Sequence, residues 1–167
     1  MKTEHISSGI FKPGRHLELY DNEGHDPYQS HGKLAEPSTC PECSAVYNDG
    51  QWQWITVPNN AQHAKCPACR RIHEKMPAGY VTIAGEFVQT HFDELTGLIQ
   101  TLAANEKIEH PMQRLMSIEK QDTGALITTT DIRLARRIGE ALHKAYKGQL
   151  DFKYNEAEYL LRVRWER

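Results

Sequence analysis

Hydrophobic and polar residues follow clear local periods from residue 80 onward. Several stretches alternate between the two kinds of residue, as β-strands with one buried face do. These stretches are 80–88, 112–120, 125–129, 150–154 and 159–165. Turn residues at Asp122-Thr123-Gly124 and at Asn155-Glu156 predict that the last four stretches form two hairpins.

Two further stretches carry hydrophobic residues every three or four positions, which is the spacing of one helix face. The first begins after Thr90, where a capping box is predicted, and ends near Asn105. The second covers 132–147 and follows a helix cap at Thr130 or Asp131. Each is long enough to cover part of a sheet.

The predicted order is strand, helix, strand, strand, helix, strand, with one extra strand. This is the split βαβ order of ferredoxin-like domains, in which both helices cover one face of an antiparallel sheet. The sequence therefore predicts an α+β protein whose residues 77–167 form a ferredoxin-like domain. The stretch 125–129 has no aromatic residue where the common RNA-recognition version of this fold has two.

All four cysteines of the chain lie in two Cys-x-x-Cys motifs. The motifs place Cys40 beside Cys43 and Cys66 beside Cys69. Two such pairs supply the four thiolates that structural zinc prefers, and four protein ligands leave no open position for catalysis. The sequence thus predicts a zinc ribbon over 40–76.

Disulfides and a redox-active cysteine pair are the alternatives to zinc. Disulfides need an oxidising compartment, and we expect no secretory signal because the first residues lack an apolar run. Redox motifs of this type follow a βαβ pattern and usually occur once. No phosphate-binding glycine loop or nucleophile motif is found, so we expect no enzymatic activity and no small-molecule substrate.

Trp52 and Trp54 lie between the two cysteine pairs, in a stretch over 51–57 that alternates as a short strand and follows a turn signal at Asn48-Asp49-Gly50. Alternation places both indoles on one face. They are predicted to form the apolar floor of the ribbon, and stacking on nucleic-acid bases is the alternative.

The charge of the chain is low overall but unevenly distributed. The 167 residues carry a formal net charge of −2, which argues against a general nucleic-acid coat. Residues 131–167, however, hold nine Lys and Arg against six Asp and Glu. No run of eighteen apolar residues occurs, so we expect no membrane association and a cytoplasmic location.

The second predicted helix has an apolar side and a basic side. A basic helix side can follow an RNA backbone, and a solvated surface is the alternative. Two arginines after the second cysteine pair are further candidates for phosphate contacts. The predicted RNA-binding residues are Arg133, Arg136, Arg137, Lys144, Lys147, Arg70 and Arg71.

Residues 1–39 show no periodicity and are rich in Gly, Ser, His, Pro and charged residues. Such a composition predicts an extended N-terminal arm. Either the arm orders when it binds a partner, using its isolated aromatic residues, or it is a leader without a role.

The motifs together resemble a known family. Cys40-Pro-Glu-Cys43 with the Trp52 to Trp54 stretch, Cys66-Pro-Ala-Cys69, and residues 124–139 are similar to the archaeal and eukaryotic export adaptor of the large ribosomal subunit, linked to nonsense-mediated decay, in a short bacterial form. The resemblance implies binding to the ribosome or to rRNA, with the large subunit as the expected partner, and no catalysis. It also suggests a role in translation regulation or in ribosome hibernation under stress.

Two hypotheses about function follow. The chain is either a ribosome-associated, rRNA-binding zinc protein or a zinc-ribbon adaptor between proteins that does not contact RNA. Salt dependence separates them, because phosphate contacts weaken steeply with ionic strength and apolar protein interfaces do not.

Overall fold

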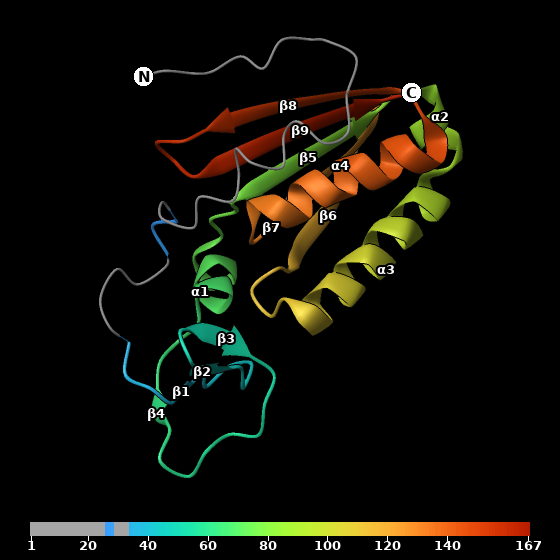
Figure 1. Ribbon diagram of the computed structural model, residues 1–167. Coiled ribbons are helices and arrows are strands. Elements are labelled where there is room, and N and C mark those ends of the chain that lie inside the picture. The colour runs from blue at the N-terminus through green and yellow to red at the C-terminus, as the bar shows by residue number, and fades with distance from the viewer. Residues whose placement is uncertain (1–25, 29–33) are drawn as a thin grey trace.

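The computed structural model describes residues 26–28 and 34–167, which contain two β-sheets and four helices (Figure 1). The predicted fold class is confirmed, since a four-cysteine cluster is followed by a sheet domain with helices. Most of the predicted N-terminal arm, residues 1–25 and 29–33, lies outside the described residues.

A small sheet surrounds the cysteines and has the strand order β3-β2-β1-β4. Its strands are β1 (Ser38–Thr39), β2 (Val46–Asn48), β3 (Gln51–Gln53) and β4 (Gln62–His63). Asp49 and Gly50 join β2 to β3 with positive φ angles of 53° and 77°, as the predicted turn requires. The sheet begins at Ser38, two residues before the predicted ribbon.

The large sheet has the strand order β6-β7-β5-β9-β8. Its strands are β5 (Gly79–Ala84), β6 (Leu115–Gln121), β7 (Gly124–Thr129), β8 (Gln149–Asn155) and β9 (Leu160–Glu166). Neighbouring strands are antiparallel except for β5 and β9, which pair in parallel. The sequence predicts a wholly antiparallel sheet, and the parallel pairing of β5 with β9 departs from that prediction.

The extra strand β9 causes this difference, because it lies between β5 and β8 instead of at an edge. Its inward residues Leu161, Val163 and Trp165 are all buried. By contrast, β8 carries the charged residues Asp151 and Lys153, which suit a strand at the edge of a sheet.

The first expected helix differs from the prediction at its start. Strand β5 ends at Ala84, and Gly85, with a φ of 112°, leads into the short helix α2 (Glu86–Thr90). Residues 85–88 were wrongly expected to continue the strand. The Thr90 hydroxyl donates to backbone carbonyls of α2 and so does not cap α3 (Phe92–Glu109), which extends four residues beyond Asn105.

The second expected helix is confirmed as α4 (Ile132–Tyr146). Its cap is Asp131, whose carboxylate accepts a hydrogen bond of 2.7 Å from the backbone N–H of Arg133. Lys147 and Gly148 both have positive φ angles where the helix ends.

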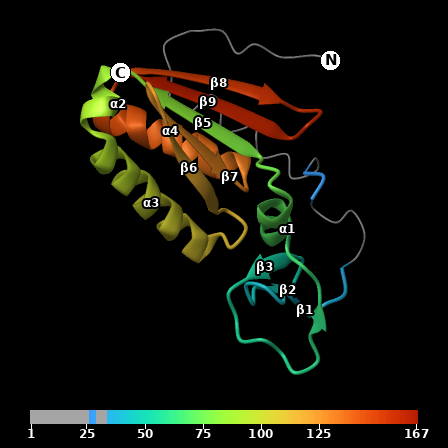
Figure 2. The same cartoon turned by 180° about the vertical axis from the view of Figure 1, so that it is seen from behind.

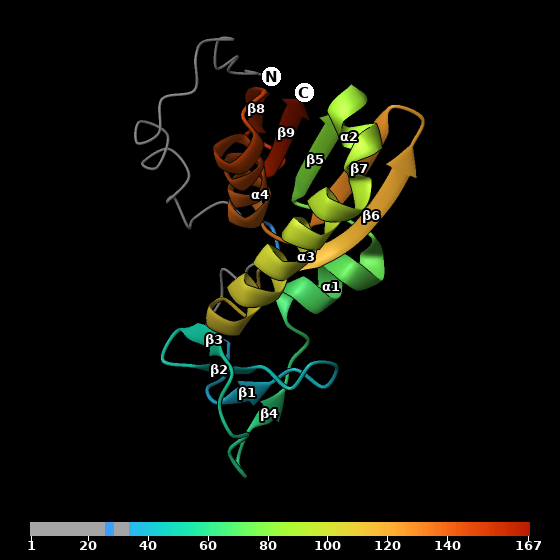
Figure 3. The same cartoon turned by 90° about the vertical axis from the view of Figure 1, so that its right-hand side faces the viewer.

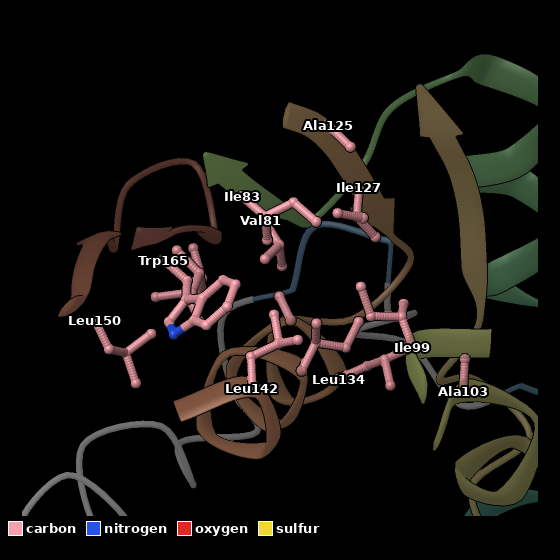
Figure 4. Close-up of a cluster of buried hydrophobic side chains, with 14 of the residues drawn as sticks. Val81, Ile83, Ile99, Ala103, Ala125, Ile127, Leu134, Leu142, Leu150 and Trp165 are labelled. Carbon is pink, nitrogen blue, oxygen red and sulfur yellow. The ribbon is translucent and has the colours of Figure 1, made fainter. Parts of the chain in front are cut away.

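Helices α3 and α4 cover the same face of the large sheet and share one core with it (Figures 1, 3 and 4). Leu134 and Leu142 of α4 and Ile99 of α3 point toward the inward residues of β5, β7 and β9 (Figure 4). Trp165 is fully buried, and its indole N–H donates to the carbonyl of Lys147 at 2.7 Å. The core thus joins the C-terminal strand to the end of α4.

The small sheet lies beyond one end of the large sheet, and helix α1 (Pro67–Glu74) connects the two (Figures 1 and 2). Viewed from the side, the C-terminal end of α3 reaches the small sheet near β3 (Figure 3). The indole N–H of Trp54, which follows β3, donates to the carbonyl of Lys107 in α3 at 2.7 Å. We call residues 38–76 the cysteine module and residues 77–167 the sheet domain.

Candidate metal centre and basic surfaces

The four predicted ligands lie together in the cysteine module. The sulfur atoms of Cys40, Cys43, Cys66 and Cys69 are all within 4.8 Å of one another. The Sγ atoms of Cys43 and Cys66 are 3.7 Å apart. A tetrahedral metal with bonds of about 2.3 Å to sulfur places its ligands about 3.8 Å apart, so the cluster could hold one metal ion.

Two different local structures present the cysteines. Cys40 and Cys43 lie on a tight turn, closed by a 2.9 Å hydrogen bond from the backbone N–H of Ser44 to the carbonyl of Cys40. Cys66 is the cap of α1, and its sulfur accepts a 3.3 Å hydrogen bond from the backbone N–H of Cys69. Pro67 at the first helical position favours this start.

The thiols differ in their protonation. Burial raises the pKa of Cys66, and burial also raises the pKa of Cys69, to about 11. Burial acts in the same direction on Cys40, but hydrogen bonds from the backbone N–H groups of Cys66, Cys43 and Glu42 outweigh it and lower the pKa to about 7. Binding of a metal by Cys66 and Cys69 would therefore release protons at neutral pH.

Metal binding should accordingly weaken as the pH falls. Because protons compete with the metal for sulfur, and the pKa values of Cys66 and Cys69 are raised, affinity should decrease from about pH 8 to about pH 6. Competition with a chelator at several pH values measures this. An affinity independent of pH would contradict binding through these thiols.

Arg114, which precedes β6 in the sheet domain, contacts the cluster and was not predicted from the sequence. Its Nη1 donates to Cys69 Sγ at 3.2 Å, and its Nη2 donates to Cys43 Sγ at 3.1 Å and to Cys66 Sγ at 3.8 Å. Its Nε donates to the carbonyl of Pro111 at 2.8 Å. No motif marks this residue, because it lies 45 positions after Cys69.

The two tryptophans of the cysteine module have different surroundings. Trp52 packs against the cysteine cluster, and its ring centroid is 5.4 Å from that of Tyr47. Trp54 lies beyond the end of β3 and is 39% exposed. The prediction that both form the floor of the ribbon is right for Trp52 and wrong for Trp54, because the strand ends at Gln53 and Trp54 turns toward α3.

The three arginines of α4 all have acidic partners. Arg133 pairs with Asp131 at 3.2 Å, and Arg136 pairs with Glu140 at 3.5 Å. Arg137 pairs with Glu106 of α3. These contacts partly neutralise the basic side of the helix.

The two lysines at the C-terminal end of α4 differ from the arginines. Lys144 and Lys147 are exposed, and within 26–28 and 34–167 neither ammonium group has an acidic partner. They are the predicted RNA-binding residues of this helix that are most available to a phosphate.

The two arginines of α1 that were predicted to bind RNA differ in their exposure to solvent. Arg71 is 3% exposed, and its guanidinium donates to Asp26 at 2.6 Å. Arg70 is exposed, with its guanidinium 5.4 Å from the centre of the Tyr28 ring. Arg71 thus holds Asp26 against α1, and Arg70 remains open to solvent.

Comparison of this chain with protein-family models, with curated proteins and with solved structures found no match. None of the helices described here has the length and apolar composition needed to cross a membrane. The assignment of function therefore depends on the chain itself.

Proposed function

We propose that this chain is a cytoplasmic zinc protein that binds rRNA on the ribosome, with the large subunit as its site, and that it catalyses no reaction. The observation that carries the proposal is the pair of exposed lysines at the end of α4, Lys144 and Lys147. RNA is a polyanion with bound counterions. Exposed lysines without acidic partners can neutralise its phosphates and release these counterions, which favours binding. Binding of this kind would regulate translation or store idle ribosomes under stress.

Zinc is the metal that the cysteine cluster suits in this proposal. Four sulfur ligands in a tetrahedral arrangement are typical of zinc and also of iron. Three of the four cysteines are buried, and all four ligand positions come from the protein. A closed site of this type would stabilise the cysteine module and would leave no position for a substrate.

The ribosome is proposed as the partner because of the sequence motifs. The two Cys-x-x-Cys motifs and residues 124–139 resemble the export adaptor of the large ribosomal subunit. Residues 124–139 form β7 and the first half of α4, and Lys144 and Lys147 lie at the C-terminal end of this helix.

Replacing Lys144 and Lys147 together by glutamine tests RNA binding. The double variant should lose most cosedimentation with ribosomes at moderate salt, because two phosphate contacts disappear. The slope of log affinity against log salt concentration should become flatter by about two units. Sucrose-gradient sedimentation at several salt concentrations gives both results.

Two lysines with partners provide the matched control. Lys65 pairs with Glu42 at 2.8 Å, and the Lys120 ammonium lies 4.8 Å from the centre of the Phe92 ring. Replacing Lys65 and Lys120 by glutamine removes the same charge and should leave ribosome binding nearly unchanged. Equal effects of the two double variants would mean that only net charge matters, which contradicts a specific site on α4.

The arginines of α4 are less suitable for this test. Arg137→Glu would place a carboxylate beside Glu106, and Arg133→Glu would place one beside the helix cap Asp131. Like charges at these positions would destabilise α4. A loss of ribosome binding in such variants would not distinguish a lost RNA contact from a disturbed fold.

A protein-protein adaptor is the second candidate, and exposed apolar side chains favour it. Ile55 and Val57 are 41% and 42% exposed in the cysteine module. Ile108, next to the Lys107 carbonyl that binds Trp54, is 71% exposed. If these residues form the interface, partner binding should be insensitive to salt and should weaken in an Ile55→Ser and Ile108→Ser double variant.

A further inference from the structure

The buried guanidinium of Arg114 has no carboxylate partner among residues 26–28 and 34–167. Arg114 is 7% exposed, and within the described ranges no Asp or Glu forms an ion pair with it. A buried charge is costly unless an opposite charge compensates it. The groups that accept hydrogen bonds from this guanidinium are three cysteine sulfurs and the carbonyl of Pro111.

The negative charge of a metal-loaded cysteine cluster would compensate the positive charge of the Arg114 guanidinium. Four thiolates with one divalent cation carry a formal charge of −2, and N–H groups that donate to the sulfurs stabilise that charge. The position of Arg114 therefore fits the metal-loaded state of the cluster.

Other contacts between the two parts of the chain come from the same segment, residues 107–114. The Lys107 carbonyl accepts the indole N–H of Trp54, and Met112 packs against the cysteine cluster. The Arg114 guanidinium also lies 5.6 Å from the centre of the Trp54 ring. The segment that donates hydrogen bonds to the cysteine sulfurs is thus also the segment that holds the cysteine module against the sheet domain.

We propose that Arg114 is an outer ligand of the metal centre and that metal binding fixes the cysteine module to the sheet domain through it. The inference rests on the metal occupancy proposed above and does not depend on RNA binding. Loss of the metal removes the ion that holds the sulfurs around the Arg114 guanidinium and releases the module, while the sheet domain keeps its own core.

Arg114→Met tests the outer-ligand role because it keeps the side-chain length and removes the N–H donors. Metal affinity, measured by competition with a chelator, should fall about 10- to 100-fold. In the cobalt-loaded protein the thiolate-to-metal charge-transfer band should move to lower energy, since the sulfurs lose their hydrogen bonds. Arg114→Lys, which restores the charge but not the forked donors, should give intermediate values.

Two further variants separate this role from a structural one. Arg162→Met, on an exposed arginine of β9, should leave affinity and band unchanged. Trp54→Phe removes the hydrogen bond to Lys107 without touching a sulfur, so it should loosen the module and leave the band unchanged. If Arg114→Met matches the wild type in both affinity and band, Arg114 is only a packing residue and the proposal is wrong.

Hydrogen exchange tests the docking step on the full chain. Chelation of the metal should increase exchange in residues 107–114 as well as in the cysteine module, with β5 and β7 still protected. Unchanged exchange in residues 107–114 would overturn metal-dependent docking. A wild-type chain that binds neither zinc nor cobalt would instead refute the proposed metal centre.

Discussion

Replacing Cys66 by serine should abolish metal binding and unfold the cysteine module, with the sheet domain still folded. The buried cluster of the module is small and consists of Cys40, Cys66, Cys69 and Ala68, so we expect the stability of the module to depend on a bound metal. The freshly reduced wild-type chain should contain about one zinc, and the variant should contain none. Elemental analysis and amide exchange of residues 38–63 measure the two effects.

Ser44→Ala is the control for this substitution. Ser44 is exposed and lies next to Cys43, and no hydrogen bond of its hydroxyl is found within the described residues. Its metal content should equal that of the wild type. A Cys66→Ser variant that keeps the metal, or a wild-type chain whose cysteines form stable disulfides, would contradict the assignment of the four ligands.

Trp165→Ala should destabilise the sheet domain by about 3–5 kcal/mol, which is typical of a large aromatic residue removed from a core. The Trp165 side chain is fully buried, and the carbonyl of Lys147 loses its hydrogen-bond donor when the indole is removed. Denaturant unfolding monitored by circular dichroism gives the change in free energy.

The neighbouring residue Arg164 supplies the comparison. Arg164 lies on the same strand, faces away from the core, and forms an exposed ion pair with Glu166 at 3.2 Å. Arg164→Ala should change stability by no more than about 0.5 kcal/mol. If both variants unfold at the same denaturant concentration, β9 does not occupy the interior of the sheet.

Features set by neighbouring residues could be predicted from the sequence. The cysteine spacing within each Cys-x-x-Cys motif, the turn at Asp49 and Gly50 and the cap at Asp131 are all short-range, and the structure has each of them. The start of α2 was missed because the hydrophobic alternation of 80–88 continues through Gly85, whose positive φ ends the strand.

Features set by residues far apart in the chain could not be predicted. The period of β9 predicts a strand but does not indicate which strand it pairs with. Similarly, the basic side of α4 was visible in the sequence, but Glu106, the partner of Arg137, comes from α3. Arg114 reaches the cysteine cluster only because the end of α3 folds against the cysteine module.

The interior position of β9 has a consequence for synthesis of the chain. Strand β5 is the first strand of the large sheet to be made, and β9 is the last. The two strands nevertheless pair in parallel, with Val81 opposite Val163. While the ribosome makes the residues between them, one edge of β5 has no partner strand. The part of the core that Trp165 later fills is also uncovered during this time. Pairing across so long a separation also slows folding, so the nascent sheet domain should need protection from aggregation until β9 is in place.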